Sequence, residues 1–171
     1  YKTTATFVKP NLFRKPDRLI SSFEIHNDSD PEVGAIVAST SYSWPLANQT
    51  RLISSYAYGE REYVEHSGSL GEISFKTHHV LGQLEKTISS STNQAWTAFV
   101  GLNINRTDSY LSWVRSDLVA GAGDEGWVRT GHLKAGVNFN GSNQSKSWTG
   151  SIYGMQGVNA ISEDFQRADF A

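Results

Sequence analysis

Apolar and polar residues alternate at every second position through much of the chain. Residues 19–26 read Leu-Ile-Ser-Ser-Phe-Glu-Ile-His, and residues 52–58 read Leu-Ile-Ser-Ser-Tyr-Ala-Tyr. This period of two is typical of a half-buried strand, and an unbroken apolar run such as 33–38 is typical of a strand covered on both faces. The pattern predicts strands over 19–26, 33–38, 52–58, 95–104 and 109–115, with a turn at 105–108.

The same alternation near the end of the chain predicts a hairpin. In residues 132–139 the apolar side chains fall on one face and the polar ones on the other, and residues 147–153 repeat the pattern. Asn140-Gly141 tolerates the positive φ angles of a tight turn, so we expect the chain to reverse there. The hairpin should have one apolar and one polar face.

Helix signals are few. The sequence predicts a short helix over His79–Lys86 and a terminal helical turn over Ser162–Arg167 with Ser162 as the N-cap. All four prolines lie at or before position 45, whereas glycine dominates after Tyr58. This difference fits an extended N-terminal arm or lid, which would cover residues 1–17, followed by hairpins, and it also fits one sandwich with uneven turn chemistry.

The composition of the 171 residues limits the possible classes of protein. There is no cysteine, which excludes disulfides, thiolate metal sites and a cysteine nucleophile. A net charge of -2 argues against nucleic acid as a partner. No apolar run approaches the ~20 residues that a membrane-spanning helix needs, so we expect no transmembrane span.

These observations predict one all-β domain over residues 1–171. We expect about eight to ten antiparallel strands in a β-barrel or a β-sandwich, with the extended arm at the N-terminus. Without disulfides, aromatic packing has to hold the strands together, so we expect most of the five tryptophans in the core.

The most charged stretch lies around residues 60–66 and offers candidate catalytic groups. Glu60 and Glu62 fall on one strand face and Tyr63 on the other, with His78 and Lys134 expected nearby. Paired carboxylates suit glycoside hydrolysis, and a Tyr or His base suits a polysaccharide lyase. A solvated strand face is the competing interpretation of the same residues.

Other candidate sites are weaker. His78 and His79 are adjacent, so a strand would direct them to opposite faces, which argues against a shared metal ion. One of them alone remains a candidate haem ligand. Asp124 and Glu125 in a glycine-rich loop are candidate ligand-binding residues, together with Trp44 and Trp127, the two tryptophans that we expect to be exposed.

Three functions fit the sequence. The first is a non-catalytic recognition or assembly module, secreted or on a cell or particle surface, that works through exposed loops and aromatics as a homo-oligomer or with a glycan. The second is a polysaccharide-active enzyme, a lyase or a hydrolase, with a cleft on a sheet face. The third is a barrel that holds a small apolar ligand or haem. We favour the first, and it requires no cofactor.

Overall fold

The protein is a single antiparallel sheet in the computed structural model, which describes residues 2–13, 15–29, 32–64, 72–119, 125–143 and 145–162. Its strands are β1 (Lys2–Pro10), β2 (Arg18–Ser29), β3 (Glu32–Pro45), β4 (Thr50–Val64), β5 (Glu72–Ser90), β6 (Gln94–Leu111), β7 (Val114–Arg115), β8 (Trp127–Ser142) and β9 (Ser147–Gly157). Within these ranges no helix is long and apolar enough to cross a membrane. The all-β prediction is confirmed.

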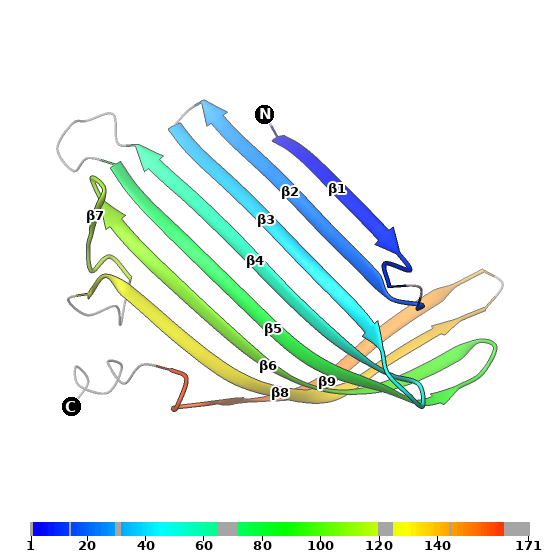
Figure 1. Cartoon of the computed structure of the whole chain (residues 1–171). Coiled ribbons are helices and arrows are strands. Elements are labelled where there is room, and N and C mark those ends of the chain that lie inside the picture. Colours follow the sequence, from blue (N-terminus) through cyan, green and yellow to red (C-terminus); the bar gives the residue numbers. More distant parts are fainter. Residues whose placement is uncertain are drawn as a thin grey trace.

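The strands follow one another as a meander (Figure 1). The spatial order is β1-β2-β3-β4-β5-β6-β8-β9, and the two-residue β7 pairs with β6. Residues 11–17, 46–49, 91–93 and 143–146 connect strands at one end of the sheet, which we call the turn end. At the opposite end, the loop end, residues 65–71 and the segment 112–126 around β7 make the longer connections.

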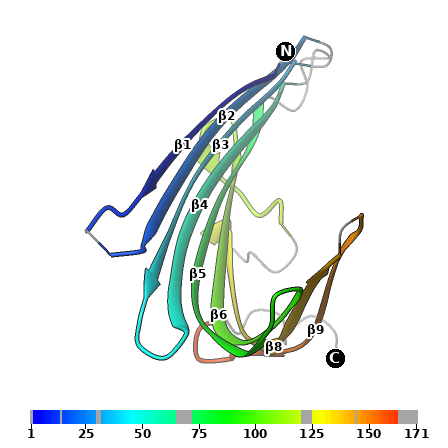
Figure 2. The same ribbon diagram turned by 90° about the vertical axis from the view of Figure 1, so that its right-hand side faces the viewer.

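The sheet is strongly curved and open (Figure 2). Strands β1 and β9 form its two edges, and each pairs on one side only in the described part of the chain. The described strands form one sheet that is not closed, so neither the closed barrel nor the sandwich of the sequence prediction is confirmed.

Three local predictions are wrong because long strands pass through the segments concerned. The predicted helix over His79–Lys86 lies inside β5, and the predicted turn at 105–108 lies inside β6. Both neighbours of each strand run alongside these segments and supply ladder hydrogen bonds, which outweigh weak local signals. The first half of the predicted arm is likewise a strand, β1, paired with β2.

The final hairpin is confirmed, but its turn is three residues later than predicted. Gly141 is still paired within β8, opposite Trp148. The Oδ1 atom of Asn143 accepts hydrogen bonds from the N–H groups of Ser145 and Lys146, at 3.1 and 2.8 Å, and this fixes the reversal. The predicted terminal helix falls on residues 163–167, outside the described residues, except for Ser162, which is in a bend.

The sheet has almost no apolar interior. Among the described residues, Phe99 is the one buried hydrophobic side chain. The prediction that most tryptophans lie in a core is therefore wrong: Trp44, Trp96, Trp113 and Trp148 are 41, 42, 74 and 40% exposed. One layer of sheet leaves both faces uncovered, so backbone ladders and cross-strand pairs hold these strands together.

Candidate functional site

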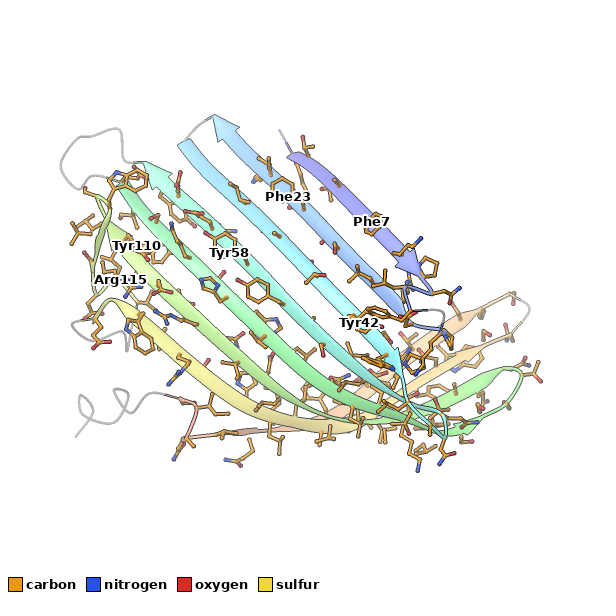
Figure 3. All side chains as sticks on the ribbon, in the orientation of Figure 1. Phe7, Phe23, Tyr42, Tyr58, Tyr110 and Arg115 are labelled. Atoms are coloured by element: carbon orange, nitrogen blue, oxygen red, sulfur yellow. The ribbon has the colours of Figure 1, made fainter. Side chains whose placement is uncertain are left out.

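The pairing register assigns every side chain to one of two faces, because cross-strand partners point the same way. Leu52, Leu84, Val100 and Ala135 are consecutive partners across four strands and share one face. Phe7, Phe23, Tyr42 and Tyr58 belong to the same face by register, and Figure 3 shows it as the convex one, turned toward the viewer.

The convex face carries apolar side chains on every long strand from β2 to β9. These side chains, which we call the apolar band, are Phe23, Ile25, Ile36, Ala38, Leu52, Val80, Leu84, Val100, Leu102, Ile104, Leu133, Ala135, Val137 and Ile152. Many of them are exposed, for example Val100 at 44% and Leu133 at 45%. An uncovered apolar surface of this extent is unusual for a water-exposed monomer and is typical of a surface that contacts a protein or a membrane.

Aromatic side chains border this band on both sides. Toward the turn end they are Trp44, Trp96, Phe139 and Trp148, and toward the loop end they are Tyr56, Tyr58, Tyr110 and Trp127. The Trp96 and Phe139 rings lie 4.6 Å apart. We call these two groups the turn-end belt and the loop-end belt.

The height of the band follows from strand geometry. On β6, Trp96 of the turn-end belt and Ile104, the last apolar position before Arg106, are eight positions apart on the convex face. At about 3.4 Å per residue this is about 27 Å of strand, or about 19 Å when projected for a tilt of about 45°. The hydrocarbon-facing band of a membrane β-barrel is about 25 Å tall, which is of the same order.

Hydrogen bonds to Asp17 hold the turn end of β3 next to the turn-end belt. The Tyr42 hydroxyl donates a 2.5 Å hydrogen bond to Oδ2 of buried Asp17, which also accepts from the Phe13 N–H at 3.1 Å. Burial alone would raise the pKa of Asp17, but these hydrogen bonds outweigh it and hold that pKa below its usual value. Phe13 in turn contacts the rings of Tyr42 and Trp44.

The concave face combines polar pairs with apolar side chains such as Val37, Phe75 and Phe99. Arg51 bonds Glu85 through Nε and Nη2, both at 2.6 Å, and Gln83 donates to the same carboxylate at 2.7 Å. Farther along, Asn103 Nδ2 lies 3.3 Å from His132 Nε2. The Lys134 ammonium lies over the Tyr153 ring, 4.0 Å from its centroid.

A shallow recess of about 400 Å³ indents the concave face near the loop end. Val37, Arg61, Tyr63 and Phe75 contribute to its walls. Gly59 also lines the recess, and a Cβ there would lie 2.8 Å from Thr77 Oγ1. Glycine at this position keeps the recess open.

The structure does not bring the predicted catalytic residues together. Glu60, Glu62 and His78 stand on the convex face, whereas Tyr63 and Lys134 stand on the concave face. Glu60 already accepts from the Tyr58 hydroxyl at 2.5 Å and pairs with Lys76 at 3.1 Å. These five residues therefore do not share one face of the sheet.

The other candidates have structural partners or lie outside the described residues. His78 and His79 point to opposite faces as predicted, and His78 Nδ1 lies 2.8 Å from the Tyr56 hydroxyl. Within the described ranges no three His, Asp or Glu side chains are grouped for a metal ion. Trp44 is exposed as predicted; Trp127 is only half-exposed and donates to Glu125 at 2.6 Å. Asp124 lies outside the described residues.

The sequence analysis missed the apolar band and its belts. The available signal was the length of the alternation: even positions from Trp96 to Tyr110 carry Val100, Leu102 and Ile104 between two aromatics. A strand of 18 residues is several times the usual length of five or six. Alternation of this length with aromatic ends is the mark of a strand that crosses a thick apolar layer.

Comparisons with known proteins agree with a curved antiparallel meander. No protein-family profile matches the chain, and none of the curated proteins matches it. Two solved structures are similar in fold. CdiB from Acinetobacter baumannii superposes with a TM-score of 0.80 at 18% identity, over 92% of this chain and 28% of that one. CdiB from Escherichia coli gives 0.76 at 14% identity, over 95% and 29%. The chain thus spans less than a third of either structure.

Proposed function

We propose that this chain forms part of the wall of a transmembrane β-barrel in an outer membrane. Its convex face contacts lipid, and its concave face lines the interior of the barrel. The observation that carries the proposal is the exposed apolar band, of the same order in height as the lipid-facing band of a membrane β-barrel, between two aromatic belts and with polar pairs on the opposite face. The structural neighbours support it, because the CdiB proteins are outer-membrane β-barrel transporters.

Hydrocarbon is the phase that suits the convex face. Each apolar side chain that leaves water gains about 25 cal/mol per Å² of buried surface, and in this sheet no second layer supplies that burial. Strands β2 to β6 and β8 pair with a neighbour on both sides over most of their length, as a lipid phase requires, although residues 127–131 of β8 have no partner in β9. The apolar alternation that a sandwich would use for its core serves here as the outer surface.

The two edge strands, β1 and β9, indicate where further strands of the barrel would pair. β1 and β9 each have one row of backbone groups facing outward, and unpaired groups in hydrocarbon cost several kcal/mol apiece. The proposal therefore includes further strands that pair with β1 and β9 and close the barrel. We place the loop end on the extracellular side, because bacterial outer-membrane barrels have their longer connections there.

Site-directed spin labelling tests which face contacts lipid. Because the chain has no cysteine, single substitutions give unambiguous labels. We would label Val80→Cys and Val100→Cys on the convex face and His79→Cys and Asn105→Cys on the concave face, in phospholipid vesicles. Dissolved oxygen concentrates in hydrocarbon, whereas a charged nickel chelate stays in water.

We expect oxygen and nickel accessibility to alternate between labels on the two faces. The convex labels should respond to oxygen and the concave labels to the nickel chelate. A label at Trp113→Cys, in the exposed segment beside β7, is the matched water-accessible control. Equal nickel accessibility of Val80→Cys and His79→Cys in membrane-bound protein would refute the proposal, as would absence of the chain from the vesicle fraction.

A further inference from the structure

One row of the convex face is basic and lies where the apolar band ends. His78, Arg106 and Arg129 are consecutive cross-strand partners on β5, β6 and β8, and we call them the basic row. The next convex position of β6 toward the turn end is apolar Ile104. The basic row thus lies at the boundary between the apolar band and the polar loop end.

Two arginines of this row are held close together. Arg106 and Arg129 are direct partners in the register, a position at which like charges repel. Both guanidinium groups lie over the Trp127 ring, at 4.5 and 5.8 Å from its centroid. The indole therefore holds two positive groups on one small area of the convex face.

On β6 an acidic side chain lies farther from the apolar band than Arg106. Asp108 accepts from Arg106 Nε and Nη2 at 3.0 and 2.8 Å and from Arg115 Nη2 at 3.1 Å. On the same convex rows Glu60 pairs with Lys76; Glu62 and Glu125 lie still closer to the loops. On β6 the charges are thus layered, with Arg106 nearest the apolar band and Asp108 beyond it, whereas on β4 Glu60 is the direct partner of Ile36 in the band.

We propose that Arg106 and Arg129 bind the headgroup phosphate of an anionic membrane lipid whose acyl chains lie against the apolar band. The inference rests on the proposed function, since it places lipid against the convex face. The planar guanidinium group matches phosphate oxygens with two parallel hydrogen bonds. A lipid phosphate lies at the edge of the hydrocarbon layer, which is the height of the basic row.

Spin-labelled lipids measure this selectivity directly. Lipid in contact with a membrane protein gives a motionally restricted spectral component, and its size can be compared for labelled phosphatidic acid and labelled phosphatidylcholine in phosphatidylcholine vesicles. We expect the chain to favour phosphatidic acid about fivefold over phosphatidylcholine, and high salt to reduce that preference only in part. Inorganic phosphate at millimolar concentration should not compete, because it lacks the acyl chains.

Paired variants assign the selectivity to the basic row. Arg106→Gln with Arg129→Gln should lower the preference below about twofold, and Arg106→Lys with Arg129→Lys should restore part of it. Lys9→Gln with Lys86→Gln removes the same charge from the convex face at the turn end and should leave it unchanged. Arg129→Gln alone keeps the Arg106–Asp108 contacts, so it reports on binding even where the double variant folds poorly.

The outcomes separate this inference from the proposed function. A restricted component for both lipids without a preference for phosphatidic acid would overturn the lipid site but support the membrane wall. An unchanged preference in the arginine variants would also overturn it, as would an equal loss in the lysine control. No restricted component for any lipid would mean that the proposed function itself is wrong.

Discussion

The two faces of the sheet differ in how much room their glycines have. On the concave face a Cβ at Gly59, Gly101 or Gly136 would lie within 3.2 Å of a neighbouring atom. On the convex face Gly82, Gly150 and Gly154 have nothing within 4 Å of that position, whereas Gly131 and Gly141 are crowded by Ile161 and by the Trp148 indole. Curvature makes side chains converge on the inner surface and diverge on the outer one. Away from Ile161 and Trp148, the convex positions therefore have more room than Gly59, Gly101 and Gly136.

The largest expected effect comes from a charge in the middle of the convex face. Leu102→Arg places a guanidinium group in the apolar band and should destabilise the membrane-inserted protein by about 2–4 kcal/mol. Asn105→Arg, on the concave face of the same strand, should cost less than about 1 kcal/mol. Urea unfolding in phospholipid vesicles gives both values. Equal losses of stability in the two variants would show that the convex and concave faces tolerate a charge equally well.

Packing on the concave face also includes a buried charge. The Glu85 side chain is 7% exposed, so Arg51→Met leaves its carboxylate with Gln83 as its remaining side-chain donor. We expect a loss of about 2 kcal/mol in the free energy of unfolding. Removing both charges with Arg51→Met and Glu85→Gln should recover at least half of it.

An exposed ion pair provides the matched control for that measurement. The Lys2–Glu24 pair is 58 and 33% exposed, and Lys2→Met should change the stability by less than about 1 kcal/mol. If Lys2→Met and Arg51→Met lower the free energy of unfolding by the same amount, the burial of Glu85 does not strengthen its ion pair with Arg51.

A methyl group tests the crowding of the concave face. Gly136→Ala would place its Cβ 2.5 Å from Tyr153 Cβ on the partner strand and should cost about 1–3 kcal/mol. Gly150→Ala, in open space on the other face of the same hairpin, should be neutral or stabilise by a few tenths of a kcal/mol. The two urea midpoints measure the difference, and a neutral Gly136→Ala would show that the β9 backbone shifts, because the added Cβ also meets the Ile152 carbonyl oxygen.

The smallest expected effect on stability concerns Asp17, in the turn between β1 and β2. The hydrogen bonds from Tyr42 and the Phe13 N–H lower the pKa of Asp17 from 3.8. A lowered pKa stabilises the folded turn above the unfolded value, and this contribution is lost as the pH falls through the folded pKa. Trp44 fluorescence should therefore report a loosening of the turn below about pH 4. Asp17→Asn should abolish that acid transition, and its persistence in the variant would assign it to another group.

Alternation predicted the strands well but not their ends. The chain through His79–Lys86 has mixed local signals and remains extended because both β4 and β6 continue beside it. Asn140-Gly141 is a good turn sequence, yet the side chain of Asn143 holds the turn three residues on. Strand ends depend on neighbouring strands, and a local pattern contains no information about them.

The candidate site could be predicted less well than the fold. An apolar strand face looks the same in sequence whether it contacts a second sheet or lipid, so Trp96 and Trp148 were assigned to a core that the structure lacks. The residues grouped as a catalytic cleft, such as Glu60 and Lys134, are separated by register and by face. Strand length and the aromatic ends of β6 were the features that distinguish the two cases.

The meander also has a kinetic consequence. Every pairing joins strands that are consecutive along the chain, apart from the short detour through β7. Each new hairpin can therefore form on the edge of the previous one in about 1–10 μs, without a search for a distant partner. The sheet can grow one strand at a time from either side, and joining the first and last strands to their neighbours becomes the slow step of assembly.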